Sequence, residues 1–198
     1  VDGMNEGGEG MNAGAAVGKR GTNEQGNKNG VNLSTALSVI EMCYGDTALL
    51  LSMPRQGLGN SAIAAVANEE QLERFKNTWA AMAITEPNCG SDSAAIRTTA
   101  TKDGDDYILN GEKIFVTSGE RADAIVVWAT LDKKLGRSAI KSFVIPKGTA
   151  GMTVERLEHK LGIKASDTAV IRLIDCRVPA NNLLGNAEID IAKGFAGV

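Results

Sequence analysis

The chain has few of the residues that build metal centres, disulfide frameworks or nucleophilic triads. Its 198 residues include one histidine, His159, and three cysteines, Cys43, Cys89 and Cys176, with no Cys-x-x-Cys pair. An odd and dispersed set of cysteines does not suit a disulfide framework, and a structural zinc site would lack ligands. A Ser-His-Asp triad would have to recruit His159 from a charged Glu-His-Lys stretch. We therefore expect no metal site and no hydrolytic triad.

The chain also lacks an excess of charge and a long apolar run. It has 21 Lys+Arg against 24 Asp+Glu, a net charge of −3, without long runs of one sign. This balance gives no basic surface for a nucleic acid. No stretch of about 18 apolar residues exists, and residues 1–30 contain no hydrophobic segment of a signal peptide. The sequence predicts a soluble, cytoplasmic protein (or one of the mitochondrial matrix in a eukaryote), with no membrane span and no nucleic-acid partner.

The N-terminal third changes from glycine-rich to helical. Residues 1–30 contain nine glycines and five asparagines, so 1–32 is predicted to be a loop or flexible segment. Residues 33–80 are predicted to form part of a helical domain, in which Asn68 and Gln71 fit a capping box. The apolar residues that recur at helical spacing are Leu33, Leu37, Ile40 and Tyr44, with Leu72 and Phe75 as a second inward stripe.

Residues 81–186 have the pattern of a β domain. Asp103-Gly104 and Asn110-Gly111 are dipeptides typical of tight hairpin turns. Eight short runs are predicted as strands: Ala81–Thr85, Thr98–Lys102, Asp106–Leu109, Lys113–Thr117, Ala124–Thr130, Ile140–Pro146, Met152–Leu157 and Ala169–Ile174. The predicted fold class is α+β, a helical segment followed by an antiparallel β-barrel or sandwich. Residues 187–198 are predicted to begin a further helical domain that is missing from the chain.

Two segments of the β region carry the chemical signal. Ala83–Asp92 and Asn110–Gly119 each end a β-type run in hydroxyl residues and glycine. Such strand ends present backbone N–H groups and hydroxyls to a ligand. Edges of this kind suit a flavin and its phosphates.

The stretch from about Trp79 to Phe195 resembles the middle, flavin-binding domain of the acyl-CoA dehydrogenase family. No single piece would suffice, but the ordered series is specific. It consists of Thr85-Glu86-Pro87 with Gly90-Ser91-Asp92, Tyr107 to Lys113, Thr117-Ser118-Gly119 with Ala122-Asp123, Ser142 to Ile145, Lys160-Leu161-Gly162 with Ser166-Asp167-Thr168, Asp175 to Pro179, and Asn182 to Gly185.

The resemblance implies a flavoprotein that uses FAD to remove hydrogen from the α and β carbons of an acyl-CoA. The residues it assigns to FAD are Met82, Ile84, Thr85, Gly90, Ser91, Phe115 and Thr117. It also places Ser91 on the acyl-CoA, and no catalytic residue in this chain, since relatives take their base from the later helical domain. Glu86 is predicted to be structural. Many relatives have an aromatic residue in place of Met82 and tryptophan in place of Phe115, so the packing on the ring is expected to differ.

Substrate and partner predictions are less specific. The basic loop Leu131–Ala139, and Arg137 in it, is the local candidate for contact with the phosphorylated end of CoA, although a solvated loop would have the same composition. The resemblance further implies an electron-transfer flavoprotein as acceptor and a homo-oligomer. Two alternatives stay open: an acyl-CoA oxidase or flavin monooxygenase relative on the same scaffold, and a non-catalytic β-barrel that binds a ligand or partner.

Overall fold

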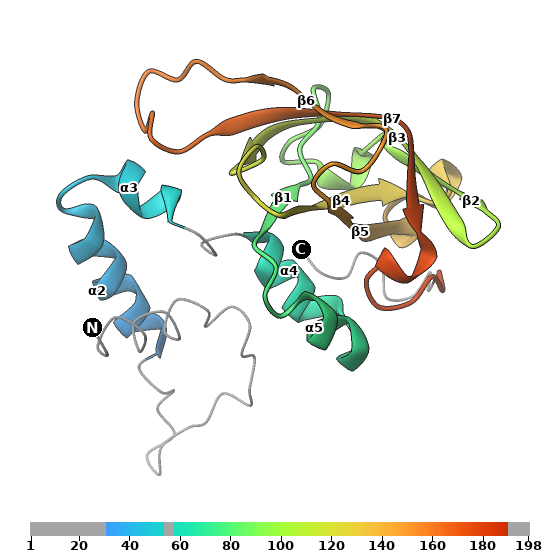
Figure 1. Cartoon of the computed structure of the whole chain (residues 1–198), viewed down its shortest axis with the longest axis horizontal. Helices are drawn as coiled ribbons and strands as arrows, with labels where there is room; N and C mark the ends of the chain where they lie inside the picture. The colour runs from blue at the N-terminus through green and yellow to red at the C-terminus, as the bar shows by residue number, and fades with distance from the viewer. Residues whose placement is uncertain (1–30, 54–57, 190–198) are drawn as a thin grey trace, which may run out of the picture.

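A computed structural model describes residues 31–53 and 58–189, with the side chains from residue 33 onward. Figure 1 shows a strongly curled sheet, with α4 and α5 against it and α2 and α3 farther out. Residues 1–30 of the predicted glycine-rich segment 1–32 and most of the predicted segment 187–198 lie outside the described residues, while residues 31 and 32 are helical rather than loop. Within the described residues, no helix has the length and apolar character that crossing a bilayer requires.

Three of the four described α-helices fall inside the predicted region 33–80, and the first begins two residues before it. The four are α2 (Val31–Cys43), α3 (Thr47–Ser52), α4 (Leu58–Val66) and α5 (Glu69–Phe75). Of these, α3 and α5 begin at polar N-cap residues. The Asp46 side chain accepts from Ala48 N at 2.7 Å and caps α3. The capping box of Asn68 and Gln71 at α5 is confirmed.

The apolar stripes of these helices are only partly buried. Phe75 of α5 is buried, as predicted, but Leu72 is 40% exposed, so the prediction that both face inward is wrong for Leu72. The side chains at helical spacing on α2 and just after it are all exposed: Leu33, Leu37, Ile40 and Tyr44. The apolar face of α2 therefore has little to pack against among the described residues.

Seven strands form one mixed sheet. They are β1 (Ala80–Ala83), β2 (Thr99–Asp103), β3 (Asp106–Thr117), β4 (Ala124–Thr130), β5 (Ile140–Pro146), β6 (Met152–Leu157) and β7 (Thr168–Pro179). The order is β1-β4-β2-β3-β7-β6, and β5 pairs with the other edge of β4. The α+β fold class, helices followed by a barrel-like sheet, is confirmed. The sheet is not wholly antiparallel, however, because β1 and β2 both run parallel to β4.

The Asn110-Gly111 dipeptide does not form the predicted turn. β3 is one strand of 12 residues that continues through it and pairs with β7, with a register shift between Leu109 and Gly111. An ideal Cβ on Gly111 would lie 2.3 Å from Thr98 Oγ1, so glycine is required there by a close contact. The long partner strand decides the outcome against local turn propensity. The Asp103-Gly104 turn is confirmed, since Asp103 pairs with Asp106 across it.

β4 is the centre of the molecule, because both of its faces are covered. All seven of its residues are buried, as is typical of a continuous apolar run. Ile125, Val127 and Ala129 point into the curl of the sheet, where they meet residues of β3, β5 and β7. Ala124, Val126 and Trp128 point to the opposite face, where they meet Ala62, Ile63 and Phe75 of α4 and α5. Two apolar layers thus hold helices and sheet together.

The contact between α4 and β1 leaves no room for a side chain at Gly59. An ideal Cβ there would lie 2.3 Å from Ala81 O and 2.5 Å from Ala80 O. We expect Gly59→Ala to push the helix off the strand and to lower the free energy of unfolding by about 1–3 kcal/mol. Chemical denaturation measures the change. The control is Gly45→Ala, which meets nothing within 4 Å; equal losses in the two variants would contradict the argument.

Candidate functional site

A pocket of about 310 Å³ lies where the end of β1 meets the end of β3. Its lining residues are Leu51, Leu58, Met82, Ile84, Thr85, Ile114, Phe115, Thr117 and Ser118. Five of the seven residues predicted to contact FAD are therefore brought together: Met82, Ile84, Thr85, Phe115 and Thr117. They come from two segments about 30 positions apart in the sequence.

A break in the β3–β7 ladder opens this side of the sheet. The register shifts between Lys113 and Val116, and Ile114 N donates instead to Thr85 O at 2.9 Å. The shift is a β-bulge, which re-aims the side chains that it contains. It turns β3 toward the segment that follows β1, so the two predicted segments lie side by side.

The bulge holds Phe115 in an unusual conformation. Phe115 has a φ of 57° and a side chain that is 62% exposed, while the next residue, Val116, is fully buried. A non-glycine residue in this region of φ costs about 1–3 kcal/mol and persists only where the surroundings impose it. Ser118, which also lines the pocket, has a φ of 60°. Two of the four described non-glycine residues with a positive φ therefore line the pocket, and the other two, Ile163 and Asp175, lie outside it.

A buried ion pair stands directly behind the pocket. Lys113 Nζ lies 2.8 Å from Glu86 Oε1, and the two side chains are 0% and 6% exposed. Glu86 Oε1 also accepts from Thr98 N at 3.0 Å and from Thr98 Oγ1 at 2.6 Å. Its Oε2 accepts from Arg97 N at 2.6 Å. Lys113 Nζ donates a second hydrogen bond to Ile84 O at 3.0 Å.

Both members of the pair have shifted pKa values. For Glu86, burial acts to raise the pKa, but the charge of Lys113 and the hydrogen bonds to the carboxylate outweigh it, so the pKa lies below its ordinary value. For Lys113, burial lowers the pKa and the attraction of Glu86 only partly opposes this. The carboxylate is thus held charged and fully hydrogen-bonded. These contacts match the structural role predicted for Glu86.

The ion pair fixes the backbone on both sides of Thr85. Lys113 donates to the carbonyl of Ile84 and to the side chain of Glu86, and the carbonyl of Thr85 between them accepts from Ile114 N. The segment from Ile84 to Glu86 is therefore immobilised by three separate contacts with β3. Sequence analysis quoted Lys113 within a motif but gave it no role. Its partner is 27 positions away, so no local pattern indicated the pair.

The remaining predicted site residues lie outside the pocket. Gly90 follows a tight turn in which Glu86 and Cys89 exchange two backbone hydrogen bonds, and an ideal Cβ on Gly90 would lie 4.0 Å from Thr85 Cγ2. Ser91 is exposed just before the short helix η2 (Ser93–Ala95). Gly90 thus lies next to the pocket, and Ser91 lies farther along the same loop.

Arg137 is exposed in η3 (Lys133–Ala139), away from the pocket. A smaller hollow of about 190 Å³ separates η2 from η3, and its cations are Arg97 and Lys133 rather than Arg137. Arg97 was missed by sequence analysis because it stands alone, outside any basic run. Also missed were Leu51 and Leu58, which are distant in sequence from the other lining residues, whereas Ile114 and Ser118 belong to the predicted segment Asn110–Gly119 but were given no role.

This chain is similar in sequence and in fold to proteins of known family. Residues 81–176 match the family "Acyl-CoA dehydrogenase, middle domain". A short-chain-specific acyl-CoA dehydrogenase of Clostridium acetobutylicum is 37% identical over 180 residues, which are 87% of this chain and 46% of the relative. The crystal structure of a glutaryl-CoA dehydrogenase of Mycobacterium smegmatis in complex with FADH2 has a TM-score of 0.70 at 32% identity. It covers 91% of this chain and 47% of that one.

An oxidase has a similar fold. The crystal structure of a prolyl acyl carrier protein oxidase has a TM-score of 0.73 at 35% identity, covering 81% of this chain and 45% of that one. In each of these comparisons the chain spans about half the length of the protein it matches.

Removing the charge of Lys113 tests the role of the ion pair. Lys113→Met keeps most of the buried volume but leaves the Glu86 carboxylate without its partner. We expect the free energy of unfolding to fall by about 3–5 kcal/mol at neutral pH, measured by chemical denaturation. The control is Lys164→Met at an exposed lysine, which should change stability by less than about 0.5 kcal/mol.

The pH dependence separates loss of the ion pair from loss of packing. In the unaltered chain, folding lowers the pKa of Glu86. Its contribution is therefore present above the unfolded pKa and is lost as the pH falls through the folded pKa. In Lys113→Met, the buried carboxyl of Glu86 has no cationic partner, so its pKa in the folded state lies above that in the unfolded state. The variant therefore becomes less stable as the pH rises and the carboxyl has to ionise. The difference between the two proteins should narrow from about pH 7 to about pH 4. A constant difference would contradict the prediction.

Proposed function

The chain belongs to the acyl-CoA dehydrogenase family, and on that premise we propose that it is the flavin-binding middle part of an FAD-dependent enzyme that dehydrogenates acyl-CoA thioesters between the α and β carbons. The observation that carries the proposal is the pocket in which Met82, Thr85, Phe115 and Thr117 meet. We further propose that residues 33–80 are part of an N-terminal helical domain and that 81–186 are the flavin domain.

The lining suits one part of a flavin. A volume of about 310 Å³ is at the small end of ligand pockets, so it fits a ring system rather than a whole dinucleotide. Met82 and the exposed ring of Phe115 offer apolar cover for a flat aromatic group. Thr85, Thr117 and Ser118 offer hydroxyls at its polar edge. Gly90 and Ser91, on the loop beside Thr85, are proposed to approach the pyrophosphate.

The pocket supplies binding but no acid–base group. Bound flavin would supply the hydride acceptor. The nine lining residues of the described chain include no Asp, Glu, His, Lys or Cys, and the oxygens of nearby Glu86 are committed to hydrogen bonds. Removal of the α proton needs a base within hydrogen-bond reach. We therefore propose that the base comes from outside this chain and that the chain alone does not turn over.

The substrate and the partners follow from the resemblance. Acyl-CoA is proposed to pass along Ser91 toward the basic hollow between η2 and η3, where Arg97 and Lys133 join Arg137 as candidates for its phosphates. An electron-transfer flavoprotein is the proposed acceptor. The exposed apolar face of α2 is the kind of surface that further protein covers, which supports a homo-oligomer. A cytoplasmic or mitochondrial-matrix location stays a prediction.

A second candidate is an oxidase on the same scaffold, favoured by the similarity to the prolyl acyl carrier protein oxidase. The two functions differ in what reoxidises the flavin. Assaying an enzyme that contains this chain with an acyl-CoA panel, first with an artificial acceptor and then with oxygen alone, separates them. We expect turnover with the artificial acceptor and little with oxygen; equal rates would favour the oxidase.

Flavin binding can be measured without catalysis. Titrating FAD into the purified chain and following flavin fluorescence should show weak, saturable binding, because the pocket is open on one side. Phe115→Ala should weaken binding roughly tenfold through the loss of an aromatic contact. Leu161→Ala, at a fully exposed apolar residue outside the pocket, is the matched control. Equal affinity of the Phe115 variant and the unaltered chain would remove Phe115 from the proposed site.

A further inference from the structure

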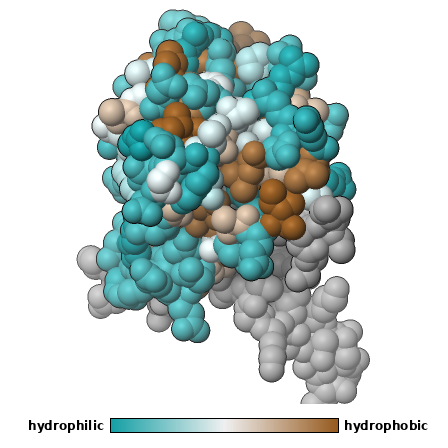
Figure 2. All heavy atoms as spheres, turned by 90° about the vertical axis from the view of Figure 1, so that its right-hand side faces the viewer, coloured by the Kyte–Doolittle hydropathy of each residue, from teal (hydrophilic) through white to brown (hydrophobic). Residues whose placement is uncertain are grey.

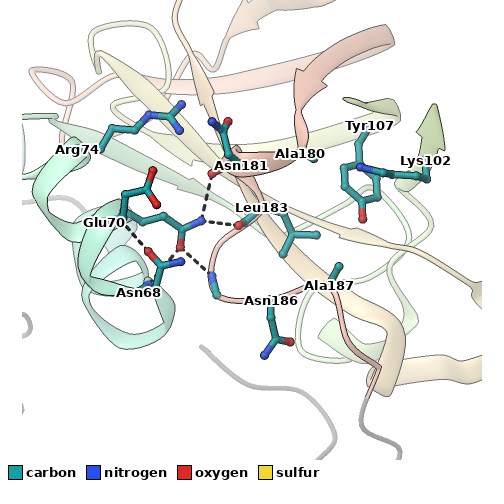
Figure 3. A pocket seen from close by; sticks show the side chains of 12 residues that line it. Asn68, Glu70, Arg74, Lys102, Tyr107, Ala180, Asn181, Leu183, Asn186 and Ala187 are labelled. Carbon is teal, nitrogen blue, oxygen red and sulfur yellow. Dashed lines mark hydrogen bonds between the residues drawn. The ribbon is translucent and has the colours of Figure 1, made fainter. Parts of the chain in front are cut away.

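We propose a second ligand site in this chain, which binds a small polar molecule that carries an oxyanion. It is a pocket of about 310 Å³ between α5, the β2–β3 hairpin and the segment after β7. Figure 3 shows this pocket, with Arg74 and Asn68 on one side and Lys102 and Tyr107 on the other. It shares no lining residue with the proposed flavin pocket, so it stands independently of the proposed function.

The buried side chain of Gln71 fastens the wall of this pocket at three points. Its Nε2 donates to Asn181 O at 3.1 Å and to Leu183 O at 2.7 Å. Its Oε1 accepts from Gly185 N at 2.9 Å. These bonds fasten the segment after β7 to α5, across more than 100 positions of sequence. The pocket is therefore preformed, which reduces the entropy cost of binding.

Tyr107 has a polar atom without a partner. Its side chain is only 6% exposed, and its ring packs edge-on against Phe143 at 5.2 Å. Figure 3 shows its hydroxyl pointing into the pocket. Within the described residues the hydroxyl makes no hydrogen bond to protein, and its oxygen is not among the buried unpaired side-chain atoms, so it is accessible to solvent and to a ligand. The ring is anchored while its hydroxyl is free to donate to a ligand.

Lys102 supplies a positive charge over the ring of Tyr107. Its Nζ lies 4.6 Å from the centre of the Tyr107 ring and forms no ion pair with a described residue. On the opposite wall, the Arg74 guanidinium lies over Phe75 at 4.8 Å and donates to Asn182. Glu70 is the one carboxylate among the lining residues. Two cations against one anion favour a negatively charged ligand.

The other residues that line the pocket indicate that the rest of the ligand, beyond its oxyanion, is polar. Amide side chains of Asn68, Asn181 and Asn186 contribute to the pocket. Figure 2, which views the side of the molecule that carries the β2–β3 hairpin, shows a mainly hydrophilic surface with apolar side chains in small groups. The volume exceeds that of a bare oxyanion. A phosphate or carboxylate on a hydroxylated body of a few carbon atoms fits this chemistry.

The test is a titration of the purified chain with glycerol 3-phosphate, glycerate and glycerol, followed by the amide NMR shifts of residues that line the pocket. We expect saturable binding of at least one of the two anions and none of glycerol. Which anion binds more tightly identifies the oxyanion. No saturable binding of either anion, or equal binding of glycerol, would overturn the proposal.

Two variants locate the binding. Tyr107→Phe keeps the ring and its contacts but removes the hydroxyl, and should raise the Kd roughly fivefold. Lys102→Gln removes the charge and should raise it roughly tenfold or more. The control is Lys164→Gln, an exposed lysine that does not line the pocket, which should leave the Kd unchanged. Anion binding that neither Tyr107→Phe nor Lys102→Gln weakens would place the ligand elsewhere and refute the site.

Discussion

The buried pair of Glu86 and Lys113 is the constraint on which the geometry of the proposed flavin pocket depends. The sheet opens at this point, because the pairing of β3 with β7 is interrupted between Lys113 and Val116 and β1 ends at Ala83. Two segments that share few ladder hydrogen bonds are then connected by one ammonium group that contacts both Ile84 and Glu86. An apolar pair of the same volume could fill the space, but it would not fix the direction of the Ile84 carbonyl.

Burying these charges is costly unless each is compensated. Five hydrogen bonds replace the water lost by the carboxylate: three from the residues that lead into β2, one from Lys113 and a long one from the Cys89 thiol. The close fit of Gly111 against Thr98 belongs to the same arrangement, because the Thr98 hydroxyl is one of those donors. Strand β2, the bulge in β3 and the turn after β1 are thus held by one network, and the pocket is on its outer surface.

Much of the fold could be predicted from local patterns. β4, β5 and β6 have the predicted bounds, since each is an apolar or alternating run that polar turns delimit, and the capping box marked the start of α5. Local patterns failed where a distant segment decides. The Asn110-Gly111 dipeptide has strong turn chemistry, but β7, about 60 positions later, pairs with β3 on both sides of it. For the site, the motifs led to five residues that share a pocket. Lys113 was missed because its partner Glu86 is 27 positions away, and Arg97 because it stands outside any basic run.

The positive φ of Phe115 limits how this position can change in evolution. Glycine or asparagine would relax the backbone, yet neither brings an aromatic surface to the pocket; β-branched residues would add strain without adding a ring. At this residue, the substitutions that would relieve backbone strain are therefore the ones that would remove the aromatic ring from the pocket. Only other aromatic residues keep a ring at the pocket without adding strain to the backbone. We therefore expect few residue types to be accepted at position 115.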